Sequence, residues 1–286
     1  MRSFRAWLCL LSLLPGAAGC ATAPYHFGRE QEYVTGYRLP AGEPQVSFGS
    51  PHKFLDASGW IWPVSLFSKL LLWNKKVDSH IVSTQTVAAV EQYLADNDLK
   101  DVKVRINDYS VGDEWRRTFR NKAVAPFWRY TFGFFSWLNY TMMPQRFFGG
   151  DNYNPYSNTI NIYSDLKPVV LHESGHSKDF AGRTYKGNYA FLYGVVPFFN
   201  LYPEARASSD ALSYLRAKDD TVGWKDGYKV LYPAYATYLG GNFGNLLAYP
   251  WNSAAQAAAV LPAHIVGRIK ASRVPLKADL QPPPGP

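Results

Sequence analysis

Two histidines and a glutamate have the spacing of a catalytic metal centre. Behind the apolar run 169–171, the chain reads His172-Glu173-Ser174-Gly175-His176, an H-E-x-x-H motif. Because an α-helix turns once in about 3.6 residues, the two histidines would lie one turn apart on one helix face. Their imidazole nitrogens could then bind one tetrahedral Zn²⁺ ion. Glu173 would be the general base, taking a proton from a water molecule activated by the metal.

The residues around the motif predict a strand followed by a helix. Residues 158–163 alternate between polar and apolar side chains, which is typical of a half-buried strand. Ser164 or Asp165 would cap the helix that carries the motif, and Pro168 falls in its first turn, where a missing N–H costs little. Gly182 would end this helix. The motif is therefore expected on the helix of a strand–helix unit.

The motif and its lead-in resemble those of the zincin metallopeptidases and, among them, of the gluzincins. In these families an uncharged apolar lead-in precedes H-E-x-x-H, and an uncharged and then a hydrophobic residue follow it. Ser177 fits the first of these two positions, whereas Lys178 departs from the second. Strand 158–163 resembles the edge strand along which zincins align a peptide substrate by β-addition. The resemblance covers residues 150–217 and implies a zinc peptidase with a zincin-like fold.

A catalytic zinc ion needs a third protein ligand, with water in the fourth position. Glu204 is the main prediction, because Pro203 suits a first helical turn and the helix that follows would extend to Leu215. Gluzincins likewise take their third ligand from a glutamate on a downstream helix. They often carry an aspartate four residues later that bonds a histidine, and Ser208 occupies that position here. A serine at position 208 therefore departs from the gluzincin pattern, in which an aspartate at this position supports a histidine ligand.

Other residues remain open as ligands or as partners of the ligands. Asp179 follows the motif on the same helix face, so it could orient an imidazole or bind the metal itself. Asp210 and His264 are further alternatives for the third ligand. The metzincin pattern, with a third histidine six residues after the second, does not occur in the sequence, because Gly182 stands there.

Cleavage of a peptide bond also needs a donor that stabilises the negative oxygen formed in the transition state. Tyr185, Tyr189, Tyr202 and Arg206 all lie close to the predicted ligands along the chain. The sequence does not distinguish among these four oxyanion candidates.

The N-terminus has the pattern of an export signal that ends in a lipidation site. Arg2 and Arg5 precede the short apolar stretch 6–14, and the small residues Ala17-Ala18-Gly19 lead to Cys20. This pattern resembles a bacterial lipobox, although an alanine occupies the usual leucine position. The resemblance implies an exported lipoprotein, lipid-anchored at Cys20 in a bacterial cell envelope. Ordinary secretion is the alternative.

The composition is that of a globular protein rich in aromatic residues. Of its 286 residues, 47% are apolar and 16% are aromatic, and the formal net charge is +8. Positive charge favours anionic partners, but the Lys and Arg residues form no cluster with nucleic-acid spacing. A nucleic-acid partner is therefore not expected. The expected partners are a peptide or protein substrate and the membrane.

The chain divides by composition into successive segments. Residues 1–20 are the signal with its lipobox, and residues 21–80 are a tether followed by an aromatic segment. Residues 81–220 form the expected zincin-like catalytic domain. Residues 221–272 are an apolar helical region, and residues 273–286 are a disordered tail.

Several stretches are unusually apolar or aromatic, namely 59–73, 125–149 and 230–266. Each could be buried in the protein or lie at a membrane. Within the last of them, pieces 235–248 and 254–265 could form a membrane hairpin, with Gly240 and Gly244 as small packing residues. They could equally be buried helices that cover the catalytic core.

The sequence as a whole predicts an α+β fold with an edge strand, an active-site helix, a second helix that carries Glu204, and aromatic-rich helical extensions. The expected function is that of a zinc-dependent metallopeptidase-like hydrolase of the cell envelope, in which Glu173 activates water to attack a peptide bond. The alternatives are a non-catalytic, envelope-anchored binding or structural lipoprotein, and a zinc amidase that acts on cell-wall peptides.

Overall fold

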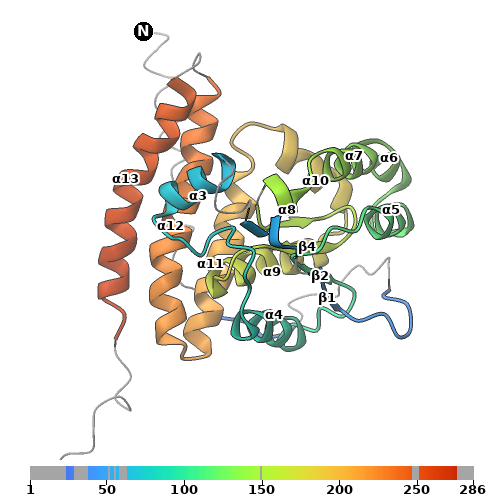
Figure 1. The fold of residues 1–286 in the computed structure, drawn as a ribbon, viewed down its shortest axis with the longest axis horizontal. Helices are drawn as coiled ribbons and strands as arrows, with labels where there is room; N and C mark the ends of the chain where they lie inside the picture. The colour runs from blue at the N-terminus through green and yellow to red at the C-terminus, as the bar shows by residue number, and fades with distance from the viewer. Residues whose placement is uncertain are drawn as a thin grey trace, which may run out of the picture.

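A four-stranded sheet lies in the centre of the molecule, surrounded by helices (Figure 1). The computed structural model describes residues 24–28, 38–50, 52–54, 56–57, 63–148, 150–246 and 251–275. Most of these residues are helical, and the protein is α+β, as the sequence predicts. The strands are β1 (Val46–Phe48), β2 (Lys103–Ile106), β3 (Asn152–Asn154) and β4 (Thr159–Ile162).

The strands follow the order β1-β2-β4-β3, and β3 runs antiparallel to β4 while the other pairs are parallel. β4 therefore lies inside the sheet, and β1 and β3 form its two edges. The predicted strand within residues 158–163 is confirmed, but its prediction as the edge strand is wrong. Local alternation reveals a strand, whereas its place in the sheet depends on β2 and β3, which pair with its two sides.

One face of the sheet is apolar and packs against three helices. These are α4 (Thr84–Asp96), α9 (Lys167–Ala181) and α11 (Leu201–Ala217). Because side chains alternate along a strand, Val104 of β2 and Ile160 and Ile162 of β4 point to this same face. They are buried in one core with Leu171 of α9 and Leu212 of α11. This core fixes α9, the helix of the H-E-x-x-H motif, against the sheet.

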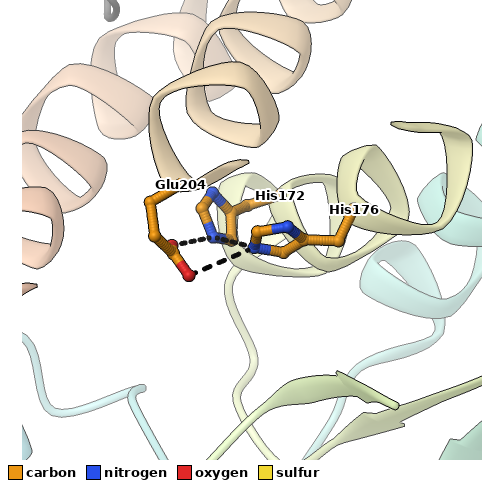
Figure 2. A group of neighbouring side chains, drawn as sticks. All are labelled: His172, His176 and Glu204. Carbon is orange, nitrogen blue, oxygen red and sulfur yellow. Dashed lines mark hydrogen bonds and ion pairs between the residues drawn. The ribbon is translucent and has the colours of Figure 1, made fainter. Parts of the chain in front are cut away.

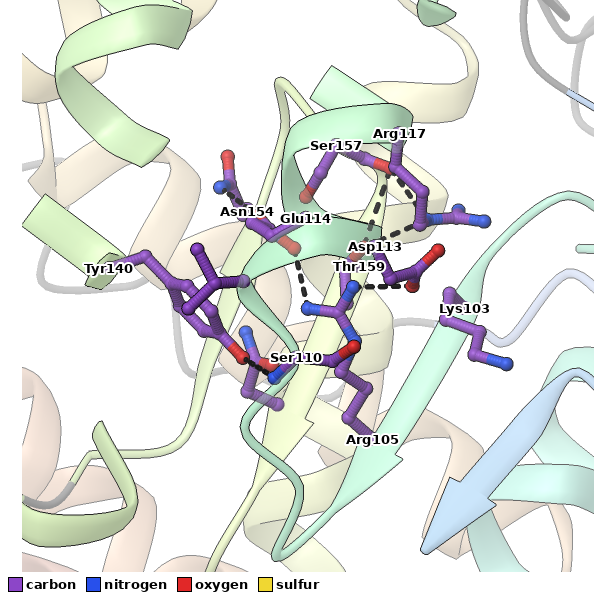
Figure 3. Close-up of polar contacts among 12 residues, drawn as sticks. Lys103, Arg105, Ser110, Asp113, Glu114, Arg117, Tyr140, Asn154, Ser157 and Thr159 are labelled. Carbon is purple, nitrogen blue, oxygen red and sulfur yellow. Dashed lines mark hydrogen bonds and ion pairs between the residues drawn. The ribbon is translucent and has the colours of Figure 1, made fainter. Parts of the chain in front are cut away.

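The opposite face of the sheet carries buried charged groups (Figure 3). Arg105 of β2 donates hydrogen bonds to Glu114 at 2.5 Å and to Asp113 at 2.6 Å, both in the first turn of α5 (Val111–Arg120). Glu114 also accepts a hydrogen bond from Asn154 of β3 at 2.6 Å. Arg105 and Glu114 have no exposed surface. Since an unpaired charge would be costly there, this network holds α5, β2 and β3 together.

The aromatic stretch 125–149 forms short helices beside α5. They are α6 (Pro126–Trp128), η2 (Arg129–Gly133), α7 (Phe134–Met142) and α8 (Gln145–Phe148). Trp128 packs against α10 (Lys186–Val195), where its ring lies 5.2 Å from that of Phe191. Gly187 makes this contact possible, because a Cβ at that position would lie 2.2 Å from the Trp128 ring.

The apolar C-terminal region forms two long helices that lie side by side (Figure 1). They are α12 (Thr221–Gly244) and α13 (Trp251–Ser272), and α3 (Pro63–Leu72) packs against both. A Cβ at Gly240 would lie 2.6 Å from the Cα of Gln256, so glycine permits the close approach. The two apolar pieces therefore lie on helices that pack against each other. Among the described residues, no helix is both long enough and apolar enough to cross a membrane.

The N-terminal part of the chain contributes to the sheet. Val46–Phe48 lies within residues 21–80, which the sequence predicts as a tether and an aromatic segment, yet it pairs with β2. A strand of three residues is too short to show alternation, so local pattern could not reveal it. The predicted signal with Cys20 and residues 276–286 of the predicted tail lie outside the described residues.

Two carboxylates, Asp78 and Asp151, lie close together at the ends of β3 and β4. They accept hydrogen bonds from the backbone just before β3 and just after β4. The N–H of Gly150 donates to Asp78, and the N–H of Ser164 donates to Asp151, each at 3.0 Å. Burial, together with the nearby Asp151 charge, raises the pKa of Asp78 to about 7. Burial also raises the pKa of Asp151. One of the two carboxyl groups is therefore expected to lose its proton only near neutral pH.

We expect Asp78→Asn to stabilise the protein by about 1–3 kcal/mol more at pH 8 than at pH 5. Because the pKa is raised from 3.8 to about 7, the folded protein keeps this proton after the unfolded chain has lost it, so stability is lost progressively as the pH rises from 3.8 to about 7. Urea unfolding at the two pH values measures the difference. Asp226→Asn is the control, because that side chain is 47% exposed. An equal gain at both pH values would contradict the prediction.

Candidate metal centre

Helix α9 places His172 and His176 on one face, one turn apart, as the sequence predicts. The helix begins after Leu166, Pro168 lies in its first turn, and Gly182 follows its last residue. The side chains of both histidines are buried, with relative exposures of 10% and 4%. The local pattern of the sequence is therefore sufficient to position two of the three predicted ligands.

The predicted capping residues of α9 have other roles. Leu166 is the N-cap, so the helix begins later than Ser164 or Asp165 would require. Asp165 instead accepts hydrogen bonds from the hydroxyls of Ser83 and Thr86, at 2.6 and 2.7 Å, at the start of α4. The capping prediction for α9 is wrong, because Leu166 is its N-cap and this carboxylate is bound to Ser83, the N-cap of α4.

Glu204 of α11 completes a group of three possible ligands (Figure 2). Nε2 of His172 lies 3.1 Å from Nε2 of His176 and 3.1 Å from Oε2 of Glu204. Nε2 of His176 lies 3.5 Å from Oε1 of Glu204. Ligand atoms placed about 2.0–2.1 Å from a tetrahedral ion are about 3.3–3.4 Å from one another. The three side chains therefore have the spacing of ligands around one ion, and this buried group could hold a metal.

Small residues allow α11 to approach α9 closely enough for Glu204 to reach the histidines. A Cβ added at Gly175 would lie 3.0 Å from the carbonyl oxygen of Ala207. Ala207 and Ala211 of α11 have no exposed surface. The glycine inside the H-E-x-x-H motif therefore has a packing role in addition to its place between the ligands.

Ser208 supports His172 from the other side of the imidazole ring. Its hydroxyl lies 3.1 Å from Nδ1 of His172, and it is fully buried in α11. A hydrogen bond at Nδ1 fixes the ring orientation and leaves Nε2 directed towards the other ligands. Ser208 thus occupies the place predicted for a residue that supports the ligands.

We expect Ser208→Ala to weaken zinc binding about 10–100-fold while leaving the fold intact. The variant loses the hydrogen bond at Nδ1, so the imidazole of His172 is no longer held in one orientation. Competition with a chromophoric zinc chelator measures the affinity. Ser209→Ala makes the same chemical change at the next position of α11 and should keep the affinity. Equal affinities for both variants would contradict the role of Ser208.

Glu173 lies beside the ligands and is 8% exposed. Burial raises the pKa of Glu173 to about 8, whereas His172 and a hydrogen bond from the backbone N–H of Tyr153 oppose this rise. A cation held by the three ligands would favour the ionised carboxylate. Tyr153 belongs to β3, so the edge strand of the sheet adjoins the predicted general base.

Two tyrosines that the sequence analysis does not predict lie at the ligand group. The hydroxyl of Tyr193 in α10 donates to Glu204, and the Tyr193 ring stacks on His176 with centroids 5.8 Å apart. Tyr238 of α12 also hydrogen-bonds Glu204. Burial and the Glu204 charge raise the pKa of Tyr193, and the Glu204 charge and burial raise that of Tyr238. Both hydroxyls therefore stay protonated and can donate hydrogen bonds.

The orienting aspartate and two of the oxyanion donors that the sequence predicts are bound to one another. Asp179 accepts hydrogen bonds from Tyr189 at 2.7 Å and from Arg206 at 2.8 Å, so these three residues bind one another. Tyr185 and Tyr202 are 76% and 48% exposed. Within the described part of the chain, the hydroxyl groups that contact Glu204 belong to Tyr193 and Tyr238 instead.

The two alternative third ligands also have other partners. Asp210 accepts a hydrogen bond from Tyr93 and lies 3.4 Å from Nζ of Lys178. Nε2 of His264 lies 2.7 Å from the carbonyl oxygen of Leu71 in α3. Of the predicted candidates, Glu204 alone joins the two histidines in the part of the chain that the structure describes.

Lys178 departs from the gluzincin pattern, and its surroundings explain how a charge is accommodated there. Its Nζ donates to the carbonyl oxygen of His26 at 2.7 Å and lies 4.2 Å from the centre of the Tyr25 ring. The ion pair with Asp210 balances its charge. A lysine at this position therefore fastens the N-terminal segment 24–28 to the motif helix.

Comparisons of the chain with family models, with curated proteins and with solved structures gave no match. The chemistry of this protein is therefore inferred from the donor atoms and the residues around them.

Proposed function

We propose that this protein is a zinc-dependent hydrolase that cleaves peptide bonds. The observation that carries the proposal is the buried group formed by His172, His176 and Glu204, with Glu173 beside it. Two imidazole nitrogens and one carboxylate oxygen form a ligand set used by catalytic zinc sites, which keep a fourth position for water. A bound zinc ion would supply Lewis acidity, which makes a water molecule acidic enough to ionise near neutral pH.

The residues around the ligands have complementary roles in this proposal. Glu173 accepts the proton of the attacking water and delivers it to the leaving amine. The N–H of Tyr153 holds the Glu173 carboxylate in position. Tyr193 and Tyr238 supply protonated hydroxyls beside Glu204. We assign to them the stabilisation of the oxyanion that was predicted for other residues, for which each O–H would turn from Glu204 to the substrate oxygen.

A peptide substrate is favoured by the position of the edge strand. Within the residues that the structure describes, β3 pairs with β4 on one side only, and its Tyr153 N–H contacts the general base. An extended peptide could add to this edge through main-chain hydrogen bonds, with its scissile bond near Glu173. The zincin-like arrangement of edge strand, motif helix and ligand helix is part of the same proposal, as are export and lipid anchoring at Cys20 in a bacterial envelope.

We expect Glu173→Gln to keep about one zinc per chain and to lower turnover about 10²–10⁴-fold, because the amide cannot accept the proton. Metal analysis and a panel of labelled proteins, peptides and peptidoglycan, digested side by side, provide the measurement. Glu91→Gln, an exposed glutamate on α4, is the matched control.

The outcomes of this experiment distinguish the alternatives. Cleavage of peptidoglycan alone would favour a cell-wall amidase over a peptidase. Zinc binding without turnover of any substrate would favour a non-catalytic binding protein. A folded protein without zinc would contradict the proposal altogether.

A further inference from the structure

Helices α3 and α13 together present an apolar face to solvent. α13 lies on the outer side of α12, away from the sheet, and α3 packs against the same pair (Figure 1). The exposed apolar side chains of this α3–α13 face are Leu66, Leu70, Trp73, Leu261, Ile265 and Ile269. Their relative exposures lie between 45% and 62%. Single exposed apolar residues are common on proteins, but six of them on two helices that pack together indicate an interaction surface.

The spacing of these residues places them along one stripe of each helix. Leu66, Leu70 and Trp73 follow the spacing i, i+4, i+7 at and just after α3. Leu261, Ile265 and Ile269 follow at intervals of four residues along α13. Each stripe therefore covers about two helical turns or more on one side of its helix.

Specific contacts join the two helices into one surface. The ring of Trp73 stacks on buried His264 of α13, with centroids 3.9 Å apart and planes inclined by 10°. The guanidinium carbon of Arg268 lies 4.8 Å from the centre of the Trp73 ring. His264 also contacts the carbonyl oxygen of Leu71 at 2.7 Å. Trp73 is thus held at the junction of the two stripes while 57% of its surface remains exposed.

The two helices of this face carry charges of one sign. Neither residues 57–77 nor residues 227–278 contain Asp or Glu. Lys75 follows Trp73, and Arg268, Lys270 and Arg273 occupy the last turns of α13 and the chain just after it, all exposed. The apolar face therefore has a cationic border at the Trp73 end.

We propose that the α3–α13 face binds the surface of an anionic lipid bilayer, with the two helices lying in the plane of the interface. Leucine and isoleucine side chains would enter the acyl boundary, Trp73 would lie at the headgroup level, and the cations would contact lipid phosphates. A second copy of the chain fits less well, because the two helices offer no carboxylate to neutralise the partner's cations. This proposal is independent of the proposed hydrolase activity.

The test is co-sedimentation of the full chain with vesicles, using Cys20→Ala in every protein so that no acyl chain contributes. The protein with an unchanged α3–α13 face should bind phosphatidylcholine–phosphatidylglycerol vesicles more tightly than pure phosphatidylcholine vesicles. Leu261→Ser with Ile265→Ser should lower binding about ten-fold or more. Lys270→Glu with Arg273→Glu should remove the preference for the anionic vesicles.

Matched variants and a mass measurement make the test decisive. Ile81→Ser with Val222→Ser changes two apolar residues that are 67% and 70% exposed outside the face, and it should leave binding unchanged. Thermal unfolding checks that each variant folds. Equal binding to both vesicle types, or equal losses in both serine pairs, would overturn the proposal. A dimer in light scattering that Leu261→Ser with Ile265→Ser converts to a monomer, without vesicle binding, would assign the face to a second copy.

Discussion

Replacing Glu204 with alanine is expected to reduce bound zinc from about one per chain to nearly none, with an affinity loss of at least about 10³-fold. Glu204 is the only carboxylate in the ligand group of the described chain, and its oxygens lie 3.1 and 3.5 Å from the two histidine Nε2 atoms. Without it, two neutral imidazoles would remain to hold a doubly charged ion in a buried site. Metal analysis after dialysis and chelator competition would measure the loss.

Asp210→Asn provides the control for this prediction on the same helix. Asp210 is the alternative carboxylate suggested by the sequence, but it is bound to Tyr93 and lies near Lys178. Zinc binding should therefore persist in that variant. Circular dichroism should show that Glu204→Ala remains folded. If Glu204→Ala kept zinc and Asp210→Asn lost it, the assignment of the third ligand would be wrong.

Glu114→Ala is expected to destabilise the protein by about 3–5 kcal/mol, which is among the largest effects of a single substitution. Glu114 lies 2.5 Å from the buried guanidinium of Arg105 and also accepts a hydrogen bond from Asn154 (Figure 3). Its removal leaves part of the Arg105 charge uncompensated where no water can reach it. Urea unfolding, with the slope of the transition compared between variants, would measure the change.

Two further variants separate the charge effect from simple truncation. Arg105→Met combined with Glu114→Leu removes both charges and should recover a large part of the lost stability. Asp226→Ala breaks an ion pair with Lys229 whose side chains are 45–47% exposed, and it should cost less than about 0.5 kcal/mol. A cost for Glu114→Ala as small as that of Asp226→Ala would contradict the importance of the buried network.

The buried Arg105–Glu114 network is connected to the candidate metal centre through β3, because neighbouring residues of this strand contact each of them. Asn154 hydrogen-bonds Glu114, and the neighbouring Tyr153 donates its N–H to Glu173. Loss of Glu114 therefore frees the edge strand on one side of the general base. The rate of substrate turnover per folded molecule should therefore be lower in Glu114→Ala than in the wild-type protein.

The sequence by itself determined the features that depend on local geometry. The helical period alone brings His172 and His176 to one face, and Pro168 and Gly182 mark the two ends of their helix. The alternation within residues 158–163 sufficed to identify β4 as a strand. Glu204 could be predicted because Pro203 suits a first helical turn and because the resemblance to gluzincins implies a glutamate ligand on a downstream helix.

The tertiary structure decided everything that depends on contacts between distant segments. β4 is an inner strand because β2 and β3 pair with its two sides, and β1 is a strand because β2 lies beside it. Tyr193 and Tyr238 reach Glu204 from helices α10 and α12, and no local pattern marks either residue. Asp179 shares the helix face of the histidines, yet Arg206 and Tyr189 bind it instead. The helical period determines on which side of a helix a residue lies, but tertiary packing determines which side chains it contacts there.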